Sequence, residues 1–183
     1  MTPLLGFSGF SGSGKTTLLA ALIALLHARG LCIGLVKHSH HAFDIDHPGK
    51  DTHTLRQAGA SRVAIGSSKR WALMVERAVP HEASLGELVH QVDDPSLHLI
   101  LVEGFRHETH PKIEVHRPSL GHPLLAVNDA SVIAIATDDP GLDTCGRTRL
   151  PLDDVPRVEA FVLDYITAAR GQRPAPVYGR SPA

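Results

Sequence analysis

The segment Gly9-Phe10-Ser11-Gly12-Ser13-Gly14-Lys15-Thr16 matches the phosphate-loop pattern G-x-x-x-x-G-K-[ST]. An apolar run at residues 4–7 precedes it, and a helical pattern follows it directly. In such a loop, glycines let successive backbone N–H groups turn inward around phosphate oxygens, while Lys15 supplies a positive charge and the Thr16 hydroxyl ligates magnesium. The helix adds the positive end of its dipole. The segment predicts a nucleoside-triphosphate site between a strand and a helix, and a ligand-free glycine- and serine-rich turn is the alternative.

The composition indicates one folded domain. The chain has 183 residues, of which 43% are hydrophobic, and this is enough for one α/β core but too little for two ordinary domains. We predict a single nucleotide-binding domain over residues 1–170. Residues 171–183 are rich in proline and have little to bury, so we predict a disordered tail there.

Charge and cysteine content restrict the functional class. The 18 Lys and Arg residues nearly balance 19 Asp and Glu residues, so we predict no binding to nucleic acid or to an anionic membrane surface. Cys32 and Cys145 have no metal-binding or disulfide spacing, which fits a reducing compartment. The N-terminal segment lacks a basic region, and no apolar run is long enough to span a bilayer. We therefore expect a cytoplasmic protein without a signal peptide.

The spacing of apolar residues predicts a doubly wound α/β fold with a mostly parallel sheet of the P-loop NTPase type. Residues 17–29 carry leucines at helical spacing, and Gly30 follows where a helix C-cap is expected. The short apolar segment 32–37 is then the return strand of a right-handed βαβ unit. Further strands are predicted at residues 97–102, 112–117 and 132–137, and further helices at residues 51–57, 85–92 and 155–169.

A different pattern occupies residues 62–76. Two β-rich runs, 62–66 and 71–75, flank the polar segment 67–70, and this predicts an antiparallel hairpin arm. Such an arm lies at or beyond the edge of the main sheet, where an unpaired strand is a pairing hazard. A second copy of the chain would cover it in a homodimer. Packing of the hairpin on its own domain explains the sequence equally well.

Glu103 is the candidate magnesium carboxylate and, with Lys15, a candidate catalytic residue. It ends the apolar run 97–102, and ligands collect where such strands end beside a phosphate loop. An ordinary surface carboxylate at a strand end is the alternative.

Three aspartates follow the second predicted strand and are further candidates for magnesium. They are Asp44, Asp46 and Asp51. We favour Asp51 because it can begin the predicted helix at 51–57, which would fix its position. A plain N-cap role is its alternative.

Histidines gather beside Lys37. His38, His40, His41 and His47 follow it in a polar loop, in a chain with 13 histidines. The cluster fits a transition-metal store, a phosphate-contacting site or a solvated loop, and no cysteine is nearby to complete a tetrahedral zinc site. We favour contact of Lys37 and His38 with substrate or phosphate.

Asp138 follows the predicted strand at 132–137. An aspartate there can accept hydrogen bonds from the N1 and 2-amino groups of guanine, a pair of donors that adenine lacks. The pattern therefore favours GTP over ATP. An acidic turn before Pro140 is the alternative interpretation.

Together, these motifs resemble the MobB family, the molybdopterin-guanine dinucleotide biosynthesis adaptors within the phosphate-loop GTPase superclass. The similarity covers nearly the whole globular part. The phosphate loop is common to many nucleotide-binding proteins, whereas three segments are more specific: Leu35-Val36-Lys37-His38-Ser39-His40-His41, Arg70-Trp71-Ala72-Leu73-Met74 and Leu99-Ile100-Leu101-Val102-Glu103-Gly104-Phe105. Pro48-Gly49-Lys50-Asp51 and Ala58-Gly59-Ala60 also match. The chain departs from the family pattern at residues 144–151 and in its tail.

The resemblance implies a homodimer that binds GTP with Mg²⁺, hydrolyses it slowly, and assists a guanylyltransferase of molybdenum cofactor biosynthesis in attaching GMP to molybdopterin. Molybdopterin itself becomes a candidate ligand, and the hairpin is expected to reach the partner subunit. The implied phosphate contacts are Gly12, Gly14, Lys15, Thr16 and Thr17, within a loop completed by Gly9 and Ser13. Magnesium is assigned to Thr16, Asp51 and Glu103, and Lys37 and His38 line the cleft.

Two other classes share the phosphate loop. A nickel or cobalt metallochaperone GTPase would explain the 13 histidines, but the usual cysteine and histidine motif is missing. A small-molecule kinase would need a lid with arginines at the transition state, for which Arg106 and Arg117 are the candidates.

Overall fold

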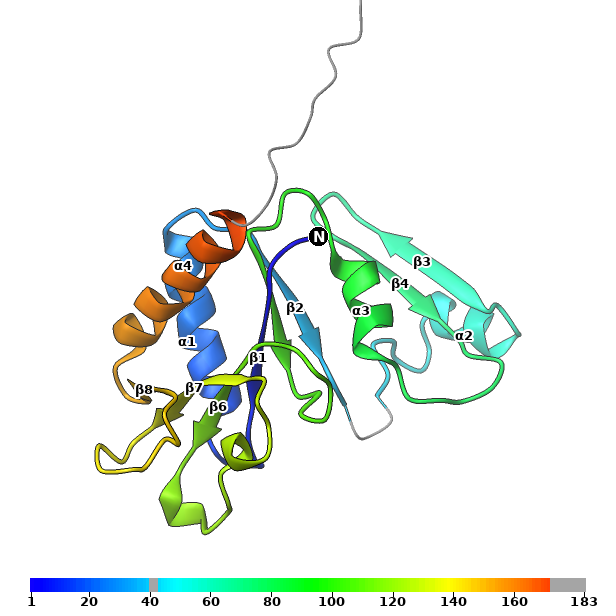
Figure 1. Cartoon of the computed structure of the whole chain (residues 1–183). Coiled ribbons are helices and arrows are strands. Elements are labelled where there is room, and N and C mark those ends of the chain that lie inside the picture. Colours follow the sequence, from blue (N-terminus) through cyan, green and yellow to red (C-terminus); the bar gives the residue numbers. More distant parts are fainter. Residues whose placement is uncertain (40–42, 172–183) are drawn as a thin grey trace, which may run out of the picture. The chain divides into compact units, whose positions relative to one another are not determined.

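The chain forms two compact units in the computed structural model, which describes residues 1–39 and 43–171 (Figure 1). One unit contains Met1–His38 and the chain from Leu85 onward, and the other is Ser39–Ser84. The strands are β1 (Leu4–Ser8), β2 (Ile33–Lys37), β3 (Arg62–Gly66), β4 (Trp71–Val75), β5 (Leu99–Glu103), β6 (Lys112–His116), β7 (Val132–Thr137) and β8 (Thr148–Pro151). The helices are α1 (Lys15–Ala28), α2 (Asp51–Gln57), α3 (Leu85–Val92) and α4 (Val155–Gly171), with short 3₁₀ turns η1 (Pro118–Leu120) and η2 (Leu125–Val127).

The first unit is built on one six-stranded sheet in the order β2-β5-β1-β6-β7-β8. Every neighbouring pair of strands in it is parallel. The predicted α/β fold with a mostly parallel sheet is therefore confirmed. Because β1 is central, the loop that follows it opens at the carboxyl edge of the sheet, where open α/β sheets bind their ligands.

Strand β8 was not predicted. Its segment, within the divergent residues 144–151, has only four strand residues, and Leu150 is the one that is well buried. Such a short run carries too little alternation to be recognised. Parallel pairing with β7 decides its conformation. Of the predicted tail, Gly171 ends α4, and residues 172–183 lie outside the described residues.

Helices α1 and α4 pack on one face of the sheet, here called the helix face (Figure 1). Its buried core includes Leu5 and Phe7 from β1, Ile113 and Val115 from β6, Leu22 and Leu26 from α1, and Val158 and Val162 from α4. Burial of such side chains contributes roughly 1.5–3 kcal/mol each before the entropy cost of ordering them. This apolar layer is the main hydrophobic core of the unit.

Apart from a small cluster of Val132 and Ile135 of β7 with Ala126 of η2, the opposite face is apolar where α3 packs. There Leu85 and Val89 meet Val36, Ile100 and Val102 of the outer strands. Over the central strands the covering elements are different. The crossover 104–111 from β5 to β6 has no helix, and the crossover 117–131 from β6 to β7 has only the turns η1 and η2.

Beneath these crossovers, the sheet presents polar residues, and we call this region the polar face. It consists of Gly6 and Ser8 of β1 with Lys112, Glu114 and His116 of β6. All are buried. The Glu114 carboxylate accepts hydrogen bonds from the N–H groups of Leu125 (2.8 Å) and Ala126 (2.9 Å), which ties η2 to the sheet.

The strap, residues 105–111, crosses β1 on the polar face. The Gly6 N–H donates to the carbonyl of Pro111 at 2.8 Å. A Cβ atom at Gly6 would lie 2.3 Å from His110 Nε2, so only glycine allows the strap to approach this closely. Within the described residues, neither ring nitrogen of His110 has a hydrogen-bonding partner. Burial lowers the pKa of His110 to about 4, so the imidazole is neutral at pH 7.

The second unit contains α2 and the predicted hairpin. Strands β3 and β4 pair antiparallel from Arg62↔Val75 to Gly66↔Trp71, as predicted, and they form a sheet of their own. Arg56 of α2 forms ion pairs with Asp44 (2.6 Å) and Glu76 (2.7 Å). These bonds tie the segment before α2 to the end of β4.

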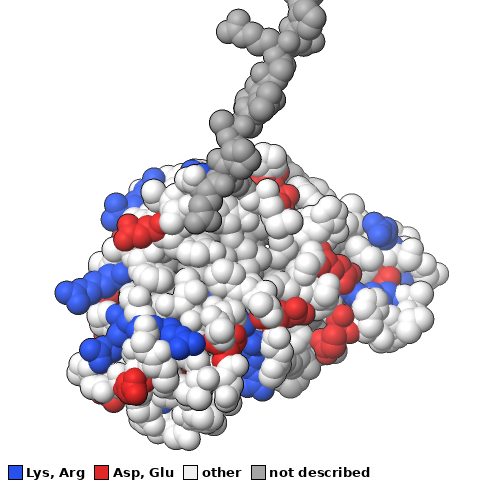
Figure 2. Space-filling view, viewed as in Figure 1, with Lys and Arg blue, Asp and Glu red and all other residues white. Residues whose placement is uncertain are grey.

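The face of the molecule shown in Figure 2 is mixed in charge. Positive and negative side chains are interspersed on this face. No helix in the described part is long and apolar enough to cross a membrane.

Candidate functional site

The phosphate loop has the backbone conformation that its glycines predict. Gly9, Gly12 and Gly14 have φ angles of 145°, 79° and 97°, which favour glycine. A Cβ at Gly9 would lie 2.4 Å from the carbonyl oxygen of Val115, so this position excludes other residues sterically as well. Gly14 is the N-cap of α1, and the helix begins at Lys15. The first N–H groups of α1 therefore face the loop and are available to an anion.

The Lys15 side chain folds back over this loop. Its ammonium donates hydrogen bonds to the carbonyl oxygens of Gly9 (2.9 Å) and Phe10 (2.8 Å). Burial lowers the pKa of Lys15, and the nearby positive charges of Lys37 and Arg106 lower it further, against the opposing effect of Glu103. An incoming phosphate would offset this repulsion at Lys15.

Glu103 lies beside the phosphate loop, as predicted. It ends β5, whose register places it opposite Phe7 at the end of β1. Its carboxylate accepts hydrogen bonds from Thr16 Oγ1 (2.8 Å) and Lys37 Nζ (2.9 Å). Burial raises the pKa of Glu103, but the hydrogen bonds from Lys37 and Thr16 outweigh it, so the pKa lies below its usual value. Glu103 is therefore ionised at neutral pH, and both of its oxygens are engaged.

The Thr16 hydroxyl and the Glu103 carboxylate are oxygen donors that suit Mg²⁺, and a phosphate in the loop would supply more. Elsewhere in the described chain, no group of three or more His, Cys, Asp or Glu side chains is arranged to hold a metal. Asp51 belongs to the second unit, and its assignment to magnesium stays a prediction. Its N-cap alternative is wrong, because Lys50 is the N-cap and Asp51 is the first residue of α2.

Lys37 and His38 both contact the strand end that carries Glu103. The His38 N–H donates to the Glu103 carbonyl at 3.0 Å, and the His38 ring lies 4.8 Å from that of Phe105. Gly104 has a φ of 94°, and a Cβ there would lie 3.0 Å from His38 Cβ. His40 and His41 lie outside the described residues, so the metal-store interpretation of the cluster gains no support here.

Asp138 follows β7 and forms an ion pair with Arg117 Nη1. Arg117 also donates from Nε to the carbonyl oxygen of Ser13 at 3.3 Å, so it joins the phosphate loop to the proposed base site. The neighbouring Asp139 accepts the Gly141 N–H at 2.8 Å and forms the acidic turn that was the alternative for this segment. From the sequence, we considered Arg117 only as a candidate for a kinase lid. Its position directly after β6 could have indicated that it lies close to the phosphate loop.

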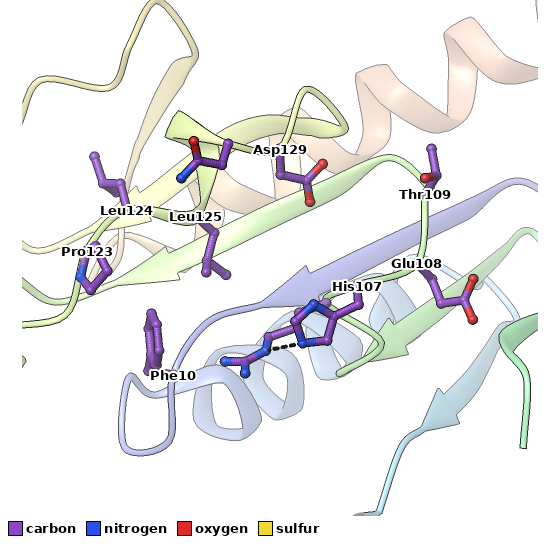
Figure 3. A pocket seen from close by; sticks show the side chains of 10 residues that line it. Phe10, His107, Glu108, Thr109, Pro123, Leu124, Leu125 and Asp129 are labelled. Atoms are coloured by element: carbon purple, nitrogen blue, oxygen red, sulfur yellow. Dashed lines mark hydrogen bonds between the residues drawn. The ribbon is translucent and has the colours of Figure 1, made fainter. Parts of the chain in front are cut away.

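A groove opens next to the phosphate loop, and sequence reasoning missed it (Figure 3). Its volume is about 540 Å³. It is lined by Phe10 of the loop, by Arg106, His107, Glu108 and Thr109 of the strap, and by Pro123, Leu124, Leu125, Asn128 and Asp129 near η2. No sequence motif links these segments, because only the two helix-free crossovers bring them together.

This geometry agrees with comparisons to known proteins. Residues 4–138 match the family model described as MobB, molybdopterin guanine dinucleotide synthesis protein B. The chain belongs to the MobB family. The matched region contains the phosphate loop, Glu103 and Asp138, and it ends before β8 and α4.

Curated relatives extend the MobB match along almost the whole chain. The molybdopterin-guanine dinucleotide biosynthesis adapter protein of Escherichia coli is 46% identical over 93% of this chain and 97% of its own length. The adapter protein of Haemophilus influenzae is 41% identical, with 93% of each chain covered. Among solved structures, Bacillus subtilis MobB is 25% identical and superimposes with a TM-score of 0.70 over 89% of this chain and 97% of its own.

Proposed function

We propose that this MobB family member binds GTP with Mg²⁺ and acts as an adaptor in the formation of molybdopterin guanine dinucleotide. In this role it would assist the guanylyltransferase that attaches GMP to molybdopterin. The observation that carries the nucleotide part is the linked set Lys15, Thr16, Lys37 and Glu103, with the Thr16 hydroxyl 2.8 Å from the carboxylate. The curated relatives support the pathway.

Slow hydrolysis is part of the proposal. Both oxygens of Glu103 accept hydrogen bonds, and its pKa is lowered, so it is a poor general base for an attacking water. Glu103 would instead position the magnesium ion, which when bound would neutralise phosphate charge. Such a site suits a protein that holds a nucleotide for another enzyme.

Preference for guanine would depend on Asp138. Arg117 already orients this carboxylate, and guanine would supply the N1 and 2-amino donors that adenine cannot. Isothermal titration with GTP and ATP tests this directly. We expect GTP to bind at least about tenfold more tightly, since a missing partner leaves buried polar groups unpaired. Equal affinities would contradict the assignment of Asp138.

Replacement of the phosphate-loop lysine is the principal test. In the Lys15→Ala protein, the loop loses its only side-chain cation, and we expect calorimetry to detect no GTP binding with Mg²⁺ present. Lys69→Ala, in the exposed turn of the hairpin, is the matched control and should bind normally. GTP affinity retained at the wild-type level by Lys15→Ala would refute the site.

We further propose a homodimer through the hairpin of the second unit. Trp71 is 75% exposed and Ile65 is 49% exposed, and neighbouring Leu73 and Val75 are exposed too. An apolar two-stranded sheet with open edges favours pairing with a second copy. Light scattering should report a dimer for the wild type and a monomer for Trp71→Asp. A pull-down of the guanylyltransferase, with and without GTP and molybdopterin, then tests the remaining partners.

A further inference from the structure

The groove beside the phosphate loop has walls that are fixed by the polar face. The Lys112 ammonium, on a residue only 1% exposed, donates to the carbonyls of Arg106 (3.1 Å) and Glu108 (2.7 Å). It also donates to the Asp129 carboxylate on the opposite wall, at 2.9 Å. One buried cation therefore holds both walls at once. Glu114 holds the wall near η2 at a second point, through the Leu125 N–H.

Arg106 supplies the groove with a positive charge. Its guanidinium lies 5.5 Å from the centre of the Phe10 ring, and its Nε donates to His107 Nε2 at 3.0 Å. Among the described residues it has no carboxylate partner. These contacts orient the guanidinium, and its terminal nitrogens have no hydrogen-bonding partner within residues 1–39 and 43–171. An oriented guanidinium without a counter-ion is well suited to bind a phosphate group.

The rest of the lining combines an apolar wall with polar groups. Figure 3 shows Phe10 and Pro123 at one end, Glu108 and Thr109 at the other, and Leu125 between them. The Asn128 side chain has no hydrogen-bonding partner in the described part of the chain, whereas Figure 3 shows the Glu108 carboxylate turned away from the groove. An amide offers both a donor and an acceptor. This set complements a flat ring system that carries amino and oxo groups.

We propose that the groove binds a phosphorylated pterin, with its phosphate at Arg106 and its ring system along Leu125 toward Asn128. A volume of about 540 Å³ is in the range of small-molecule sites. Phe10 lines the groove, and its carbonyl oxygen accepts a hydrogen bond from the Lys15 ammonium. Phe10 therefore belongs to both the groove and the phosphate loop. A pterin and a nucleotide would therefore bind side by side. The identity of the ligand rests on the proposed function, because that pathway joins these two compounds.

Binding can be measured with the full chain and 6-hydroxymethylpterin phosphate, using the intrinsic fluorescence of the pterin. We expect saturable binding of this ester, with the phosphate-free 6-hydroxymethylpterin at least about tenfold weaker, since a hydrogen bond to a charged group contributes about 1.5–3 kcal/mol. Inorganic phosphate alone should not displace the ester at comparable concentrations. Absence of binding by the ester, or its displacement by equimolar inorganic phosphate, would overturn the proposal.

Two variants locate the ligand. Arg106→Gln should weaken the ester at least about tenfold while changing the affinity of the phosphate-free pterin little, and the exposed Arg170→Gln in the last turn of α4 should change neither. Thr109→Trp, at an exposed position of the lining, should fill the groove and block the ester while GTP still binds. Unchanged affinity for the ester in both groove variants would place its site elsewhere.

Titration of GTP into the same samples separates the two proposals. If GTP binds and the ester does not, the groove assignment fails and the nucleotide site stands. If the ester binds and GTP does not, the nucleotide proposal fails instead. Competition between GTP and the ester would assign the groove to the nucleotide and would also overturn the pterin site.

Discussion

The two faces of the central sheet use the same strands in opposite ways. On β6, Ile113 and Val115 join the core beneath α1 and α4, whereas Lys112, Glu114 and His116 point to the other face. Both faces are buried. On the helix face, non-directional apolar packing holds the covering helices. On the polar face, directional hydrogen bonds to backbone atoms hold the two crossovers.

Because of this difference, the helix face mainly stabilises the fold, whereas the polar face mainly positions the segments that cover it. Apolar packing stabilises the fold but tolerates changes of similar volume. Hydrogen-bonded charges specify where a backbone segment lies, because a misplaced partner leaves a buried charge unsatisfied. The segments fixed in this way are the strap and η2, which carry the walls of the groove. Burying the polar face therefore has a cost in desolvation free energy, but it positions the strap and η2 next to the phosphate loop.

The largest expected effect comes from removing the charge beneath the strap. Lys112→Met keeps the length of the side chain but leaves Asp129 and two carbonyls without their donor, so we expect a loss of about 3 kcal/mol in the free energy of unfolding. Ile113→Val, one residue along on the helix face, should cost about 1 kcal/mol. Urea denaturation measures both. A smaller loss for Lys112→Met than for Ile113→Val would invert the comparison.

A second expectation concerns pH. The folded-state pKa of His110, about 4, lies below the ordinary value of 6.5, so the unfolded chain binds this proton first as pH falls. This contribution to stability is complete above pH 6.5 and is lost between pH 6.5 and 4, by at most about 3 kcal/mol.

Urea midpoints measured from pH 7 to pH 4 would test the role of His110. His110→Leu should show a shallower decline than the wild type, whereas His27→Gln, at an exposed position of α1, should follow the wild type. Equal slopes for His110→Leu and the wild type would show that the strap does not keep this imidazole neutral.

The smallest of the three effects comes from Gly6→Ala. The added methyl group would lie 2.3 Å from His110 Nε2 and 3.0 Å from Lys112 Cβ, so the strap must move. We expect a loss of about 2 kcal/mol, as for an overpacked core position. Gly86→Ala, where a Cβ meets nothing within 4 Å, is the control and should not destabilise. A stable Gly6→Ala protein would show that the strap is loosely held.

Much of the fold was accessible from the sequence. The boundaries of α2, α3, β3, β4 and β7 agree with the predicted segments. Glu103 was placed beside the phosphate loop because parallel strands end at one edge, and its contacts with Thr16 and Lys37 confirm that placement. The groove was not predictable, since its lining comes from three segments without regular periodicity.

The sequence by itself determined the phosphate loop, the strand and helix periods, and the charged residue at the end of β5. Each of these follows from local rules of spacing and backbone conformation. Lys112-Ile113-Glu114-Val115-His116 alternates as a strand with one solvent-exposed face would, and only the tertiary structure covers that face with the strap and η2. Alternation records which side chains share a face of a strand but contains no information about what packs on that face.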